Sequence, residues 1–189
     1  MDILVVLIAT IVAVVLALLY LLRVYNGLIK MRNGVRNAWS DIDVQFTFRH
    51  NLVPNLVESV KGYMSHERKT LEAVALARST AMKAGADIAT RTVAEMALSG
   101  AVGNLFAVAE GYPDLKASRN FLLLQEQLTT TENRIAFARQ HYNEMVRKFN
   151  TSIAEFPRNL VAVALGYTPE KMFAAESHDR ANDKNVPVS

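Results

Sequence analysis

The chain has 189 residues, 51% of them hydrophobic, and a formal net charge of +3 at pH 7. It contains no cysteine, which excludes disulfides, thiol catalysis and cysteine-based metal sites within it. The mild positive charge is not gathered into a basic stripe with interleaved aromatic residues, so nothing indicates a nucleic-acid partner. The length allows one domain of ordinary size and an additional element.

The apolar residues are concentrated at the start of the chain, where Ile3–Leu22 contains no charged residue, glycine or proline. About 20 helical residues span roughly 30 Å, the thickness of the hydrocarbon core of a bilayer. A cleavable signal peptide would begin with basic residues and carry a shorter apolar run, whereas this chain begins with Met-Asp. A buried core helix of this length would usually include polar residues. Residues 1–23 are therefore predicted to form a transmembrane anchor in a lipid bilayer.

The charges that flank this segment predict its orientation. The cations that follow it before the first acidic residue, Asp41, are Arg23, Lys30, Arg32 and Arg36. The positive-inside rule assigns the more basic side to the cytoplasm. We therefore expect a single-pass protein with its N-terminus outside and its remaining domain in the cytoplasm.

Small residues lie along one face of the predicted anchor. Ala9, Ala13 and Ala17 are spaced four residues apart, and Thr10 lies beside them. In lipid, close backbone approach over small residues and interhelical hydrogen bonds favour helix association. Alanine is also common in membrane helices, so this face is a hypothesis for a contact between copies of the chain.

Beyond the anchor the periodicity is helical and no pair of strands is indicated. From Leu28 to Tyr63 apolar residues recur in steps of three or four, with Arg49 interrupting the series. Pro54 predicts a kink near residues 50–54 rather than a helix end.

Two further helices are expected over about 65–84 and 88–110. The second is rich in small residues and includes Gly100 and Gly103. Internal glycines weaken a helix by about 1 kcal/mol each relative to alanine. Their presence predicts that another helix packs very close to this one.

The segment "EGYPDLK" predicts the end of one helix and the start of the next. Gly111 is expected to adopt the left-handed conformation that ends a helix. Pro113 cannot continue that helix, and Asp114 is expected to cap the following one. An alternative, Glu110 and Asp114 as an acid–base pair, has no supporting histidine or metal ligand.

The following helix has the clearest pattern in the chain, a coiled-coil-like alternation of steps of three and four. Its periodic positions are Phe121, Leu124, Leu128, Thr131, Ile135, Ala138, Tyr142, Met145, Phe149 and Ser152. The start, "FLLL", is apolar on all sides, which predicts cover from more than one neighbouring helix and favours a bundle over a two-helix coil. After Phe156 two short helical pieces are expected, the second in "TPEKMF" with Thr168 as its cap. Residues 175–189 are expected to form a flexible polar tail.

Two polar clusters are the candidate functional residues. The first comprises Asn33, Asn37, Asp41 and Arg49, and the second comprises Glu132, Arg134, Arg139 and Asn143. No Glu-x-x-His pair, metalloprotease motif or nucleophile elbow accompanies them, so no catalytic, cofactor or metal site is predicted. The main interpretation is a polar network that fixes the register of long helices. A partner-binding face and a catalytic role are the alternatives.

Four segments resemble the LemA family when taken in order. They are "YNGLIKMRNGVRNAWSDIDVQ", "RHNLVPNLVESVKGYMSHE", "LFAVAEGYPDLKASRNFLLLQEQLTTTENRIAFARQHYN" and "FPRNLVAVALGY". The resemblance implies a small protein of the bacterial inner membrane, all-α, with one N-terminal transmembrane helix followed by an antiparallel four-helix bundle over residues 24–174. It brings no catalytic residues. Two departures from the family pattern are Thr47 and Phe48, where relatives tend to have basic residues, and the final "VPVS", which lacks an aromatic residue.

These features favour a membrane-anchored scaffold that acts by association, either as a homo-oligomer or with other membrane proteins. The resemblance implies loose associations with membrane proteases and, in magnetic bacteria, with membrane organelles. An accessory or regulatory subunit of a membrane protease or sensor is therefore the first alternative. An enzyme with an unrecognised site is the second.

Overall fold

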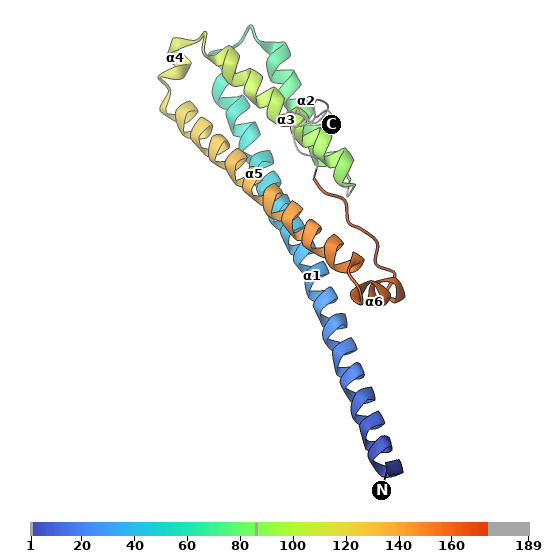
Figure 1. Ribbon diagram of the computed structural model, residues 1–189. Helices are drawn as coiled ribbons and strands as arrows, with labels where there is room; N and C mark the ends of the chain where they lie inside the picture. Colours follow the sequence, from blue (N-terminus) through green and yellow to red (C-terminus); the bar gives the residue numbers. More distant parts are fainter. Residues whose placement is uncertain (1, 86, 174–189) are drawn as a thin grey trace, which may run out of the picture. The chain divides into compact units, whose positions relative to one another are not determined.

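The computed structural model describes residues 2–85 and 87–173, and the tail expected from residue 175 lies outside this part of the chain. Over the described residues the fold is all-helical, without strands (Figure 1). Its elements are α1 (Asp2–Lys61), α2 (Arg68–Lys83), α3 (Ile88–Ala109), α4 (Pro113–Lys116), α5 (Arg119–Ala154) and α6 (Arg158–Ala164).

Helix α1 is 60 residues long and holds both the apolar N-terminal segment and the periodic stretch beyond it. Pro54 lies inside the helix, which continues to Lys61. Side chains from Ile3 to Leu22 are exposed throughout. This segment and α3 are long and apolar enough to cross a membrane by length and composition, but α3 is partly buried in the protein core whereas the N-terminal segment is not.

The chain divides into two compact units, and both α1 and α5 contribute to each of them. The first unit combines Met1–Ser40 with His141–Lys171. The second combines Asp41–Gln140 with Met172 and Phe173.

In the first unit, α6 packs on α1 just beyond the apolar segment. Val24 and Leu28 of α1 form a buried cluster with Ala162 of α6. Residues packed against this cluster are Ile153, Val161, Leu165 and Tyr167. The end of α6 is closed by Gly166, the only described glycine with a positive φ, at +66°. The Tyr167 N–H donates to the Ala162 carbonyl at 2.9 Å and the Gly166 N–H to the Val163 carbonyl at 3.0 Å, the two bonds of a Schellman motif.

The segment after α6 is not helical, so the turn expected in "TPEKMF" is wrong. Pro169 disfavours helical geometry at the preceding Thr168. The Asn150 side chain also binds both backbone groups of Glu170, accepting from its N–H and donating to its carbonyl at 2.9 Å each. The Tyr142 hydroxyl donates to the Lys171 carbonyl at 2.9 Å. Side chains of α5 thus hold this segment in a non-helical conformation.

The second unit has an apolar core to which every helix from α1 to α5 contributes. Helices α2 and α3 lie side by side (Figure 1). The most deeply buried members are Val53, Leu56, Val60, Met64, Val74, Leu98, Leu105 and Leu115. The periodic face of α5 is buried as its sequence predicts at Phe121, Leu128, Thr131 and Ile135.

Two packing expectations are wrong. Leu122 and Leu123 are 49% and 53% exposed, so the apolar start of α5 is not covered on all sides by described residues. A Cβ at Gly100 or Gly103 would meet no described atom within 4 Å, so neither glycine marks a close helix approach.

The turn between α3 and α4 differs from its expected geometry. Gly111 is not left-handed; its N–H donates to the Val108 carbonyl at 3.1 Å in a tight turn of ordinary handedness. The N-cap of α4 is Tyr112, without a side-chain hydrogen bond. Because Pro113 occupies the first helical position, Asp114 lies within the first turn and is not the cap. Its carboxylate still lies at the positive end of the helix dipole.

Candidate functional site

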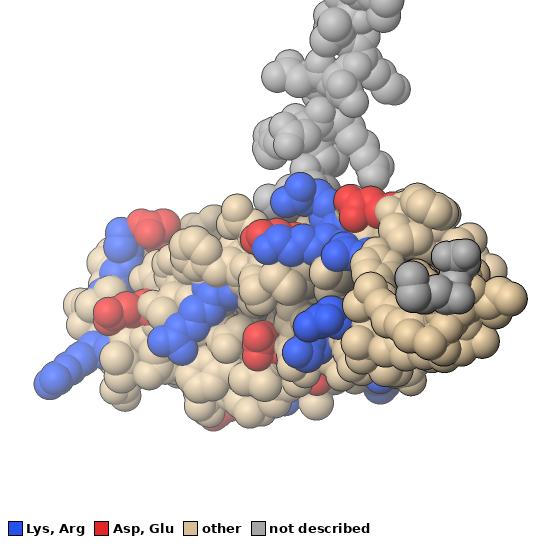
Figure 2. All heavy atoms as spheres, turned by 60° about the horizontal axis from the view of Figure 1, so that its bottom comes forward, with Lys and Arg blue, Asp and Glu red and all other residues tan. Residues whose placement is uncertain are grey.

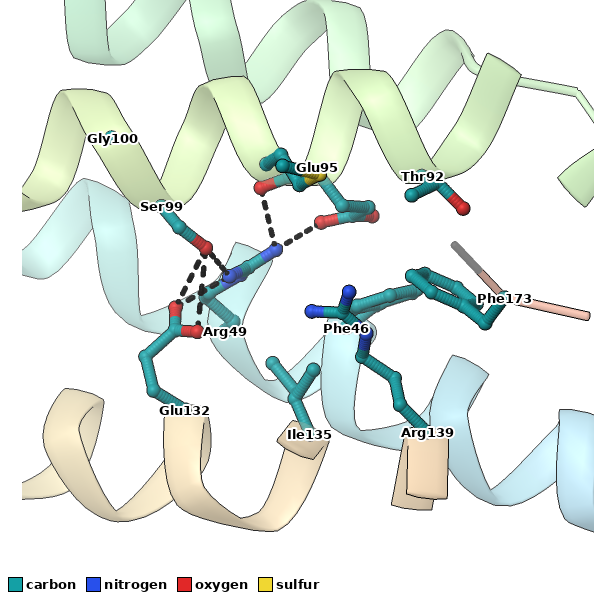
Figure 3. Close-up of a pocket in the computed structure, with 11 residues that line it drawn as sticks. Phe46, Arg49, Thr92, Glu95, Ser99, Gly100, Glu132, Ile135, Arg139 and Phe173 are labelled. Atoms are coloured by element: carbon teal, nitrogen blue, oxygen red, sulfur yellow. Dashed lines mark hydrogen bonds and ion pairs between the residues drawn. The ribbon is translucent and has the colours of Figure 1, made fainter. Parts of the chain in front are cut away.

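The principal polar feature of the second unit is a buried arginine on α1. Arg49 follows Ile42 and Phe46 on the apolar face of the helix, so its register directs it into the protein interior. The side chain is 1% exposed. It reaches α3 on one side and α5 on the other (Figure 3).

Arg49 is held by charged and polar partners from both neighbouring helices. One guanidinium nitrogen, Nη2, pairs with the Glu95 carboxylate and donates to the Glu95 carbonyl at 3.2 Å. The other, Nη1, pairs with the Glu132 carboxylate and donates to Ser99 Oγ at 2.5 Å. Ser99 in turn donates to the Glu132 carboxylate at 3.2 Å. Figure 3 shows this network spanning α3, α1 and α5.

Glu95 is the more buried carboxylate, with 2% of its side chain exposed, against 39% for Glu132. His50 Nε2 lies 3.1 Å from Glu95 Oε1. Burial raises the pKa of Glu95, but hydrogen bonds from His50 and Arg49 and the charge of Arg49 outweigh it and hold that pKa below the ordinary value. Glu95 is therefore a charged, paired group at neutral pH.

A cavity of 360 Å³ lies beside this network. Its other walls include Thr92, Gly100 and Ile135, together with Phe46 and Phe173, whose ring centroids are 6.3 Å apart. The Arg139 guanidinium lies 4.4 Å from the centroid of the Phe173 ring. Figure 3 shows Arg139 and the two aromatic rings on the side of the cavity away from Glu132.

The site is a network of ion pairs and hydrogen bonds that joins three helices. Both carboxylates face the same guanidinium, whose single positive charge balances one of the two negative charges. Removing Arg49 would leave Glu95 as a buried charge without its cationic partner, which is strongly destabilising. Among the described residues there is no group of three histidine or acidic side chains placed to hold a metal ion.

The structure brings together only part of the two predicted clusters. Arg49 and Glu132 pair directly, and Arg139 lines the same cavity. The exposed members, which do not line it, are Asn33, Asn37, Asp41 and Arg134. Asn143 is half-buried on α5 within the first unit.

The sequence clusters omitted three members of the network, His50, Glu95 and Ser99. Glu95 and Ser99 are spaced four residues apart on α3, a spacing that places both on one helix face. Glu95 is also an isolated acid in a helix rich in apolar and small residues. That contrast was the available signal for a buried charge that requires an arginine partner.

The proposed association face of the N-terminal segment is exposed at Ala9, Ala13 and Ala17. The hydroxyl of Thr10 donates to the Val6 carbonyl of its own helix at 2.8 Å. Its oxygen retains acceptor capacity.

Basic and acidic side chains are interspersed on the face shown in Figure 2, and neither sign forms a large patch there. This arrangement matches the mild net charge of the sequence.

Comparison with known proteins identifies relatives along most of the chain. A model of the LemA family matches residues 38–188. Protein LemA of Metamycoplasma hominis is 27% identical over 157 residues, covering 83% of this chain and 72% of that protein. Magnetosome protein MamQ 2 of Paramagnetospirillum magneticum is 24% identical over 189 residues, covering 87% and 70% respectively. Magnetosome protein MamQ of Magnetospirillum gryphiswaldense is 23% identical over 178 residues, covering 81% and 65%. Since the family model spans well over half of the sequence, the chain belongs to the LemA family.

Proposed function

We propose that this protein is a single-pass, membrane-anchored helical scaffold that acts by association rather than by catalysis. The observation that carries the proposal is the first third of α1. Its side chains from Ile3 to Leu22 are apolar, uncharged and exposed, and the same helix continues into the periodic part of the chain. Exposed apolar surface of this extent is stable only in lipid or against a partner.

The proposed topology follows from charge. Arg23, Lys30 and Arg32 follow the apolar segment, so the helical domain lies in the cytoplasm of a bacterium and the N-terminus lies outside the inner membrane. Within this arrangement we propose that the long helices form an antiparallel four-helix bundle over residues 24–174. The shared core of α1, α2, α3 and α5 in the second unit supports the bundle.

The proposed mode of action is self-association, with other membrane proteins as further partners. Two observations support it. The charged groups of the candidate site are engaged with one another, which suits a structural network better than a reaction centre. The segment with Ala9, Ala13 and Ala17 also presents small side chains at the surface of the membrane helix. The likeness to two magnetosome proteins supports a membrane-associated role.

Protease digestion and cross-linking in native membranes test this proposal. A protease added outside intact cells should leave the domain beyond Arg23 uncut, and lysis should expose it. Replacing Ala9, Ala13 and Ala17 together with leucine keeps the segment apolar and should lower the yield of cross-linked oligomers. Digestion of the domain in intact cells would overturn the topology. An unchanged yield would remove the anchor from the association interface.

A further inference from the structure

We propose that α6 lies in the headgroup region of the bilayer, with its exposed apolar face in contact with lipid. This inference rests on the proposed membrane anchor. It assigns to the short helix a second point of membrane attachment beside the first.

The position of α6 along α1 is the first observation. Ala162 packs on Val24 and Leu28, both buried. These two positions lie two and six residues beyond Leu22, which is about 3 Å and 9 Å along a helix axis. The headgroup regions add roughly 10–15 Å in total to a hydrocarbon core of about 30 Å, which is roughly 5–8 Å on each side. If Leu22 ends the hydrocarbon span, Val24 therefore lies within the headgroup layer and Leu28 at its outer edge, and α6, which packs on both, is held beside the headgroups.

The outward face of α6 is the second observation. Leu160 and Val163 are 63% and 77% exposed, and they share one side of the helix because they are three residues apart. Phe156, immediately before the helix, is 79% exposed. These values fall within the range of the apolar side chains in the anchor, such as Leu4 at 64% and Ile3 at 86%. Their proximity to the anchor makes lipid the occupant that fits this apolar face.

The polar surroundings of α6 match an interfacial location. A cavity of 240 Å³ between α6 and α1 is lined by Tyr20, Arg23 and Arg158, among others. Tyrosine is enriched at membrane–water interfaces, and arginine beside the cytoplasmic leaflet is attracted to anionic headgroups. Amphipathic helices that lie in the membrane interface bury an apolar face by about 5–10 Å.

The absence of native cysteine allows a direct depth measurement on the full chain. Three variants each carry a single cysteine, at Leu160, at Leu16 in the anchor, or at His141. Each cysteine is labelled with an environment-sensitive fluorophore. The labelled protein is placed in vesicles that contain an anionic lipid and a lipid carrying a quencher near its headgroup. His141 is the matched control because it is exposed in the same unit, 12 residues before Ile153 on α5. That separation is about 18 Å along the helix.

We expect quenching at Leu160 of about half or more of that at Leu16, and little at His141. A second variant combines V163E and L160E with a labelled cysteine at Phe156. The two charges should abolish quenching of this label. The helical content should stay unchanged because both substituted positions are exposed. Quenching at Leu16 but not at Leu160 would overturn this inference and leave the anchor intact. Absence of quenching at Leu16 would overturn the anchor itself. Cross-linking of two Leu160→Cys chains without lipid quenching would show that a second copy, not lipid, covers α6.

Discussion

Replacing Arg49 with methionine tests the buried network most severely. Methionine is shorter than arginine but retains an unbranched apolar stem, and it removes the charge that faces Glu95 and Glu132. The Glu95 side chain, 2% exposed, would keep His50 as a polar neighbour, with 3.1 Å between His50 Nε2 and Glu95 Oε1. Breaking a buried pair in this way costs about 3–5 kcal/mol.

The loss of stability should be large enough to measure by circular dichroism during thermal unfolding of the full-length protein in detergent. At about 2–4 °C per kcal/mol for a chain of this size, the melting temperature should fall by roughly 6–20 °C. Glu132→Gln is the matched control because its side chain is partly exposed. It should cost about 1 kcal/mol or less.

A double variant separates a lost charge from lost packing. R49M combined with E95L leaves no charge at the most buried position, and well-packed apolar replacements of an ion pair are often neutral or stabilising. The double variant should therefore recover most of the stability lost in R49M. The reasoning is refuted if R49M alone costs less than about 1 kcal/mol, or if the double variant is less stable than the single one.

Three further results are expected. The pKa of Glu95 is lower in the folded protein than in the unfolded chain, so its pairing stabilises the fold above the unfolded-state pKa. This stabilisation is lost as the pH falls through the folded-state pKa. The free energy of unfolding should therefore fall less with decreasing pH in E95Q than in the unchanged protein. Burial and, to a smaller extent, the charge of Glu170 raise the pKa of Tyr142 to about 12. The free energy of unfolding should therefore fall as the pH rises from about 10 to 12. Y142F should remove this fall and should cost about 1 kcal/mol at neutral pH, because it loses a hydrogen bond. G166A should cost about 1 kcal/mol because φ is +66°, whereas G100A should gain up to about 1 kcal/mol, both measured by thermal unfolding.

The long helices could be predicted from the sequence because the spacing of apolar residues is a local property of the chain. The periodic positions of α5 are buried at Phe121, Leu128 and Ile135, and Pro54 lies inside a helix, as predicted. The turn at residues 110–112 was located correctly by its glycine and proline. Its geometry was not, because the backbone closes with ordinary φ angles that require no left-handed residue.

Only part of the candidate site could be predicted from the sequence, because its members come from three helices that are distant in sequence. Arg49 stood out as a charge in an apolar series, but its partner Glu95 could be identified only once α3 was placed against α1. The sequence also does not predict the non-helical path of residues 168–173. Hydrogen bonds from Asn150 and Tyr142, on another helix, determine its path.

The mass of the full-length protein in a mild detergent tests the central claim of association most directly. One chain has a mass of 21.0 kDa. Native mass spectrometry should show a defined species that is an integer multiple of this value, and the triple leucine variant of Ala9, Ala13 and Ala17 should shift it toward smaller assemblies. If the protein is a single species with the mass of one chain, and native membranes also give no cross-linked oligomer, the proposal that it acts by self-association is contradicted.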